Sequence, residues 1–115
     1  MGKEETAIQR QVMDYLDAKG IYYVRPQAGG YRGGMNLKCN EGAPDIVIAL
    51  KRTGTDGVHV VCITVCCFVG IEIKTSTGKQ RPAQAEAQKR IEACGGEYWI
   101  IRSLDELKEK LGDAK

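Results

Sequence analysis

The sequence predicts one α/β domain, of the α+β kind, in which helices flank a central mixed β-sheet. Three observations support this. At 115 residues the chain suits one ordinary core. Helical and strand patterns follow one another in the order α-β-β-β-α-β-α. Hydrophobic residues make up 43% and charged residues 28%, which is typical of globular proteins. The net charge of +2 is too small to indicate a nucleic-acid partner by itself, so any basic surface must be local.

The first half of the chain predicts one helix and two strands. Residues 4–19 repeat apolar side chains at three- and four-residue spacing and end at Lys-Gly, which is typical of an amphipathic helix. Residues 21–25 are β-branched and aromatic and predict a short strand. Residues 26–44 form a glycine-rich loop, and residues 45–50 form a buried strand. The Gly, Thr and Asp content of residues 51–57 predicts a turn.

Residues 58–74 are mostly apolar and too long for an ordinary strand, at roughly 55 Å for a rise of ~3.3 Å per residue. We therefore expect a bend, bulge or break near residues 68–70. The part from 60 to 69 is apolar on both faces, so either this domain's helices or a second subunit must cover it.

The last third of the chain predicts a helix, a strand and a helix. A proline at a first helical position opens residues 82–94. The strand covers residues 97–102. Ser103 caps a final helix that ends near Leu111, with Glu106 at the capping-box position.

Charged residues are placed on two of the predicted strands in a way that indicates metal chemistry. Asp45 follows Gly42-Ala43-Pro44 and opens an apolar strand. Glu72 and Lys74 lie two apart on another strand, so their side chains share a face. Two converging carboxylates make a hard-oxygen site for Mg²⁺ or Mn²⁺. A neighbouring lysine can position water or neutralise developing negative charge.

Three further features admit either a functional or a structural interpretation. Glu5 complements the dipole of the first helix or faces the site. Gln84 lies with Gln88 on one helical stripe, and both amides need partners wherever they are buried. The glycine-rich loop is either a solvated surface loop or a phosphate-contacting one. The residues we assign to nucleic-acid contacts are Arg25, Tyr31, Arg32, Lys38 and Lys79.

Together the motifs resemble the PD-(D/E)xK nuclease superfamily, and within it the virus-type replication-repair nuclease (VRR-NUC) domain. The resemblance covers nearly the whole chain. It depends on the Glu5 helix, the two acidic motifs with Lys74, Thr77-Gly78-Lys79, Gln84 and the closing Gly-Gly-x-Tyr strand. The length and cysteine content of residues 51–70 and the presence of Gln88 depart from the family pattern.

The resemblance implies a Mg²⁺- or Mn²⁺-dependent DNA endonuclease of replication, repair or recombination, similar to Holliday-junction resolvases and active as a homodimer. It implies that Asp45, Glu72 and the Ile73 carbonyl hold the metal and that Lys74 positions water or stabilises the transition state. Glu5 would join through the metal's water shell, and Gln84 would support the site.

Two alternatives stay open. The chain could be a non-cleaving nucleic-acid-binding module with a nuclease fold. It could also be a thiol-redox protein using Cys66 and Cys67, although five cysteines without a CxxC pair are more typical of small buried hydrophobic residues. With no long apolar run and no signal-like start, we expect no membrane span, no secretion and a cytoplasmic location.

Overall fold

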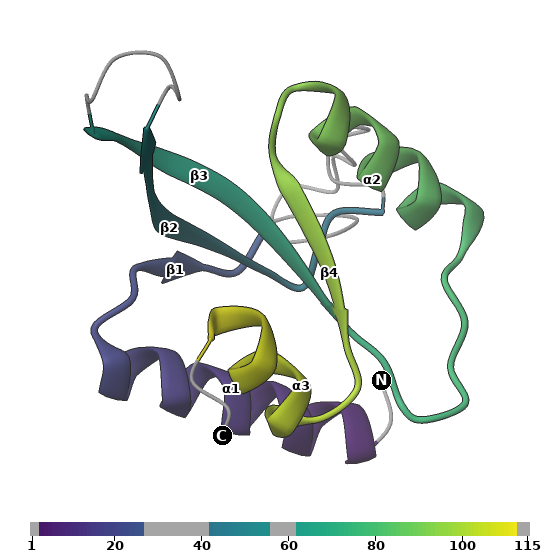
Figure 1. Ribbon diagram of the computed structural model, residues 1–115. Helices are drawn as coiled ribbons and strands as arrows, with labels where there is room; N and C mark the ends of the chain where they lie inside the picture. The colour runs from purple at the N-terminus through teal and green to yellow at the C-terminus, as the bar shows by residue number, and fades with distance from the viewer. Residues whose placement is uncertain (1–2, 27–41, 56–61, 113–115) are drawn as a thin grey trace, which may run out of the picture.

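Four strands form one mixed sheet in the order β1-β2-β3-β4 (Figure 1). The computed structural model describes residues 3–26, 42–55 and 62–112. The strands are β1 (Tyr23–Val24), β2 (Ile46–Thr55), β3 (Cys62–Ile73) and β4 (Glu97–Ile101). β2 runs antiparallel to both β1 and β3, and β4 runs parallel to β3. The helices are α1 (Lys3–Lys19), α2 (Pro82–Ala93) and α3 (Leu104–Leu111), so the predicted element order is confirmed.

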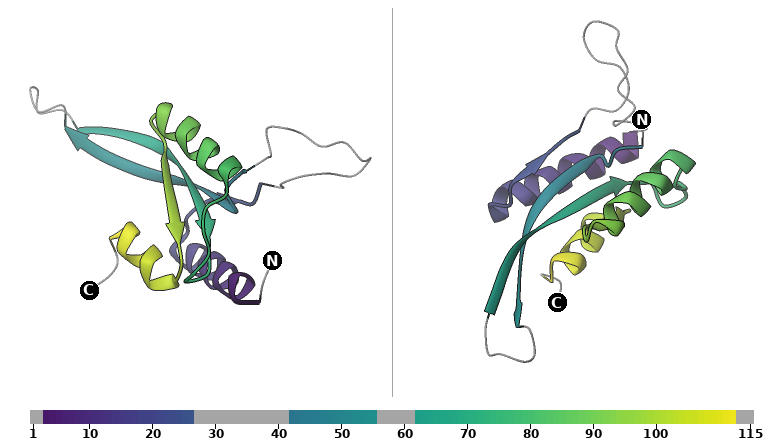
Figure 2. Two further views of the ribbon diagram at one scale, coloured as in Figure 1. Left: turned by 90° about the vertical axis from the view of Figure 1, so that its right-hand side faces the viewer. Right: turned by 90° about the horizontal axis from the view of Figure 1, so that it is seen from above.

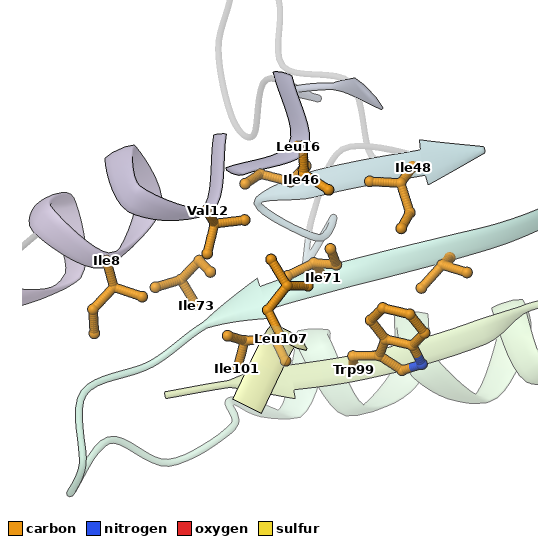
Figure 3. Packing of buried hydrophobic residues seen from close by; sticks show 11 residues of the cluster. Ile8, Val12, Leu16, Ile46, Ile48, Ile71, Ile73, Trp99, Ile101 and Leu107 are labelled. Atoms are coloured by element: carbon orange, nitrogen blue, oxygen red, sulfur yellow. The ribbon is translucent and has the colours of Figure 1, made fainter. Parts of the chain in front are cut away.

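The hydrophobic core lies between the sheet and the two helices α1 and α3. Alternate residues of the central strands point to this side, and isoleucines dominate them, with Ile46, Ile71 and Ile73 at most 1% exposed. Figure 3 shows Val12 and Leu16 of α1 approaching these strands, and Leu107 of α3 joins them. The core side of the sheet is therefore apolar, and polar residues at the intervening positions must face the other side.

Helix α2 lies on that other side and supplies the crossover between the parallel strands β3 and β4 (Figure 1). A groove of about 920 Å³ separates α2 from the outer half of β2 and β3, and its lining includes Pro44, Phe68, Ala87 and Ile91. This face is therefore covered at one end of the sheet and open at the other.

The segment between the two acidic motifs differs from the sequence prediction. Residues 51–55, predicted as a turn, continue β2, and residues 56–61 lie outside the described part of the chain. Of the bend, bulge or break predicted near residues 68–70, the bulge and the break are wrong, because β3 pairs with β2 in one unbroken register from Ile46↔Ile71 to Thr55↔Cys62. The two long strands support each other's backbone hydrogen bonds, and Figure 2 shows their hairpin projecting past the helices.

Polar side chains cap the start of helix α3. The hydroxyl of Ser103 accepts a hydrogen bond from the Glu106 amide at 3.3 Å, which confirms the predicted cap of α3. The Glu106 carboxylate in turn accepts from the backbone amide of Arg102 rather than from that of Ser103. Among the described residues, no helix is long and apolar enough to cross a bilayer.

Candidate active site

The turn Gly42-Ala43-Pro44 holds Asp45 against the start of α2. Gly42 has φ +71°, and a Cβ placed on it would lie 2.2 Å from the carbonyl oxygen of Ala83. Only glycine fits this position without displacing the helix. Pro44 packs on the bare backbone of Gly70 in β3, where a Cβ would lie 2.6 Å from the proline Cγ. Two glycines thus let the acidic turn approach both the helix and the sheet.

Asp45 stands opposite Glu72 across the β2–β3 pair. It lies one position beyond the pair Ile46↔Ile71, so continuing the register brings it to Glu72. Directly opposed residues of an antiparallel pair share a face. One carboxylate oxygen of Asp45, Oδ2, accepts a hydrogen bond from the backbone amide of Ile73 at 2.7 Å. The structure therefore brings the two predicted acids together on the face opposite the core.

Glu72 and Lys74 are both buried on that face. Glu72 is fully buried, and its Oε1 accepts a hydrogen bond from the hydroxyl of Tyr98. Its second oxygen, Oε2, lies 3.2 Å from Nζ of Lys74. Lys74 is thus the ion-pair partner of Oε2, which is buried and accepts no hydrogen bond from the described residues. A buried carboxylate oxygen without a hydrogen bond is uncommon in a folded protein.

Negative charge is concentrated around Asp45. Burial raises the pKa of its carboxyl, and the charges of Glu72 and Glu5 raise it further. The hydrogen bond from the Ile73 amide and the charge of Lys74 oppose the shift. Glu5, in the first turn of α1, is therefore close enough to act on the site electrostatically. A carboxyl whose pKa is raised by burial and by neighbouring acids, as that of Asp45 is, is typical of cation-binding and catalytic sites.

The loop after Lys74 is held in place by Arg102. Its Nη1 donates to the carbonyl oxygens of Thr75 at 2.6 Å and of Gly78 at 2.8 Å. A Cβ on Gly78 would lie 3.4 Å from Cδ of Lys74, so the lysine stem runs along this turn. Arg102 thus shapes the loop against which Lys74 packs.

The amide of Gln84 has a local contact. Its Oε1 accepts a hydrogen bond from the backbone amide of Arg81 at 2.8 Å, which satisfies the N-terminal end of α2. The side chain is 5% exposed. Arginine has no side-chain acceptor, so the reciprocal half of a capping box does not form here. Support of the site by Gln84 is therefore indirect, through the helix end on which Gly42 packs.

Three hydrogen-bonded polar residues were given no functional role by the sequence. Tyr98 was expected only as the tyrosine of the closing Gly-Gly-x-Tyr strand. Gln80 donates to Oε1 of Gln88 at 2.9 Å and also acts on the Tyr98 hydroxyl. Gln9 is buried on α1, where its Oε1 accepts from Arg25 at 3.1 Å. The available signals were the spacing of Gln9 four residues after Glu5 and the need of buried amides for partners.

The residues assigned to nucleic acid are only partly described. Arg25 is exposed at the end of β1 and bonded to Gln9, and Lys79 is exposed in the loop after β3. Tyr31, Arg32 and Lys38 lie outside the described residues. The structure thus places two predicted cations on the surface.

The donor set fits a small hard cation. In the described part of the chain, no group of three or more His, Cys, Asp or Glu residues could hold a metal ion. The side-chain ligands would then be Asp45 and Glu72, which suits Mg²⁺ because this ion retains several waters. The orphaned Oε2 of Glu72 supplies a buried carboxylate oxygen that lacks a hydrogen-bond partner.

Cys66 and Cys67 of β3 do not form a reactive pair. Neighbouring strand residues point to opposite faces, so Cys66 and Cys67 diverge. Burial and the carboxylate of Glu97 raise the pKa of the Cys67 thiol, which disfavours the reactive thiolate.

No family model, curated protein or solved structure matches the chain.

Proposed function

We propose that the protein is a Mg²⁺- or Mn²⁺-dependent endonuclease that hydrolyses phosphodiester bonds in DNA. One observation carries the proposal. A buried carboxylate oxygen of Glu72 lacks a hydrogen-bond partner, lies 3.2 Å from the Lys74 ammonium and belongs to the residue opposite Asp45. A structural ion pair does not need a second acid or an unsatisfied oxygen, whereas a cation site needs both.

Each side chain has a chemical role in this proposal. Asp45 and Glu72 hold the cation. Since the amide of Ile73 points toward Asp45, strand geometry directs its carbonyl to the same side, where it can join them. A bound Mg²⁺ or Mn²⁺ supplies Lewis acidity that polarises the phosphate and makes water a better nucleophile. Lys74 orients the attacking water or neutralises the charge that develops on the phosphate. Glu5 contributes through ordered water at the site.

The substrate we propose is branched DNA, in the manner of a Holliday-junction resolvase. One site cuts one strand, so symmetric cutting of a junction requires two sites related by a two-fold axis. We therefore propose a homodimer. The partly exposed apolar side chains on the outer half of β3, Val65 and Phe68, support it. The runner-up function is a DNA-binding module that holds such structures without cutting them.

A cleavage panel separates the two functions. Four-way, flap and linear duplex DNA are incubated with the protein in Mg²⁺, in Mn²⁺ or in chelator. We expect metal-dependent cuts in the wild type. Glu72→Gln should lower the rate on the order of 10³-fold and Lys74→Ala on the order of 10²-fold, because each removes charge from the reacting centre.

Lys79→Ala is the matched lysine control, since Lys79 is exposed in the loop after β3. It should alter the salt dependence of binding more than the rate of cutting. Binding without cleavage in both metals would favour the non-cutting module, and cleavage unchanged in Glu72→Gln would refute the proposed site.

A further inference from the structure

The buried Glu72 carboxylate depends on a hydrogen bond from another strand. Tyr98 lies in β4 opposite Gly70, two positions before the residue opposite Glu72. The two residues are therefore diagonal neighbours on the same face, within reach of an aromatic side chain. The Tyr98 hydroxyl donates to Oε1 of Glu72, while Oε2 faces Lys74 at 3.2 Å. The two oxygens of Glu72 are thus distinguished by their surroundings.

A chain of amides continues from Tyr98 to α2. Gln80 donates to Oε1 of Gln88 at 2.9 Å, and Gln88 donates to Oε2 of Glu92 at 3.1 Å. The Gln80 side chain also acts on the Tyr98 hydroxyl, where it opposes the rise in the pKa of that phenol. Gln80 thus lies between Gln88 of α2, to which it donates, and the Tyr98 hydroxyl, which donates to Glu72. An amide that donates to the phenol oxygen makes the phenol a stronger donor.

This chain prevents an alternative arrangement of Glu72. A buried carboxylate without the phenol would satisfy both oxygens by turning toward the nearest cation, the Lys74 ammonium. That bidentate pairing would turn both oxygens toward Lys74 and away from a cation beside Asp45. Because the hydroxyl of Tyr98 occupies Oε1, only Oε2 contacts Lys74, at 3.2 Å, and Oε2 keeps lone-pair capacity for a metal ion.

We propose that Tyr98 is a positioning residue that selects the oxygen Glu72 offers to a divalent cation, and that Gln80 and Gln88 hold Tyr98 from α2. The inference rests on the proposed function to the extent that the cation is the nuclease cofactor. The inference adds to the proposed function a requirement that α2 be correctly placed for the cation to bind. Residues that orient a metal ligand in this way change metal affinity or activity by about 10- to 100-fold when they are mutated.

The test is a titration of Mn²⁺ into the folded protein without DNA. Binding is measured by calorimetry or from the EPR signal of free Mn²⁺. Tyr98→Phe removes only the hydroxyl, and we expect the Mn²⁺ dissociation constant to rise about 10- to 100-fold. Gln80→Ala should raise it by a smaller factor and Gln88→Ala by less again. Tyr22→Phe is the matched control, because Tyr22 is 72% exposed, and it should bind Mn²⁺ like the wild type.

The outcomes distinguish this inference from the proposed function. If Tyr98→Phe and Gln80→Ala both bind Mn²⁺ like the wild type, the positioning role is wrong while the nuclease proposal stands. If the wild type binds Mn²⁺ and the variants do not, yet no DNA is cut, the positioning role stands and the nuclease proposal fails. Absence of Mn²⁺ binding by the wild type overturns both. If Tyr98→Phe does not fold, Gln80→Ala alone tests the positioning role: weaker Mn²⁺ binding supports it, and binding equal to that of the wild type refutes it.

Discussion

The two ends of β3 have opposite surroundings, although they belong to one continuous strand. At the Gly70–Ile73 end, β4 pairs on one edge and β2 on the other, and both faces are covered. At the Thr64–Phe68 end, Val65 and Phe68 are 52% and 49% exposed. The covered end carries the candidate active site, and the uncovered end carries apolar side chains and threonine.

The β4-side edge of β3 also differs between its two ends, being paired at one and, within the described strands, unpaired at the other. The amide of Ile73 points toward the β2 side and that of Lys74 toward Ile101 of β4. Alternation then directs the amides of Thr64 and Cys66 to the β4 side. β4 begins opposite Val69, so no described strand pairs with them there. The outer edge of β2 carries Lys51 and Arg52, charges that discourage pairing, whereas this stretch of β3 carries none.

The comparison shows that the buried end of β3 holds the candidate active site, whereas its exposed end offers a surface for a partner. Burial at one end is what makes the charges of Glu72 and Lys74 effective, because weak solvent screening strengthens their interactions. Exposure at the other end leaves a strand edge and two apolar side chains available to a partner. Substitutions at the two ends and at the acidic turn test this division.

The largest effect is expected at the covered end, from Asp45→Asn. Cleavage should fall on the order of 10³-fold, since the variant lacks one of the two acids. Because burial raises the pKa of Asp45, the folded wild type is favoured at low pH and loses stability as pH rises from about 4 through the raised pKa. The Asp45→Asn variant should not show this loss of stability over the pH range, because its amide does not ionise.

Urea denaturation from pH 4 to pH 8 in chelator, followed by circular dichroism, measures this difference. The expected result is a variant at least as stable as the wild type at pH 7 and inactive. A variant that is clearly less stable than the wild type at pH 7 would contradict the desolvation argument.

A smaller effect is expected from Gly42→Ala, which tests how the acidic turn docks on α2. The substitution places a Cβ 2.2 Å from the Ala83 carbonyl oxygen at a φ of +71°. It should lower the free energy of unfolding by about 3 kcal/mol, from the left-handed conformation and the steric overlap together. Chemical denaturation provides the measurement.

Gly20→Ala is the control for this change. Gly20 has nearly the same φ, +73°, and a Cβ added to it would have nothing within 4 Å. The Gly20→Ala substitution should lower the free energy of unfolding by only about 1 kcal/mol. Equal losses in the two variants would mean that the contact with α2 does not matter.

The smallest effect is expected at the uncovered end, from Cys66→Pro. The proline removes an amide on the free edge of β3 and leaves the ladder with β2 intact. If two copies pair through this edge, each dimer loses two hydrogen bonds worth about 1 kcal/mol apiece. The dimer dissociation constant should rise about 30-fold for a loss of that size.

Light scattering across a concentration series measures the change, with Cys66→Ser as the control that keeps the amide. A monomeric wild type at micromolar concentration would refute the homodimer. A dimer equally stable in both variants would place its interface elsewhere on the molecule.

The sequence by itself determined the element order and predicted the residues of the candidate site. Local patterns suffice for this, since an apolar period identifies a helix and an acid beside a Gly-Ala-Pro turn identifies the start of a strand. Asp45, Glu72 and Lys74 were all found this way. That Glu72 and Lys74 share a face followed from the two-residue strand period, whereas the place of Asp45 opposite Glu72 depends on the register of β2 and β3.

Only the tertiary structure decided how far the hairpin extends and which groups contact Glu72. Residues 51–55 have turn composition, but pairing with β3 keeps them extended, so a long-range contact overrides local preference. The partner of Glu72 is Tyr98, 26 residues away, and their contact depends on the register between β3 and β4. A single sequence contains no local signal for that register, which is why the contact of Tyr98 with Glu72 and the place of Gln80 beside it were found only in the folded chain.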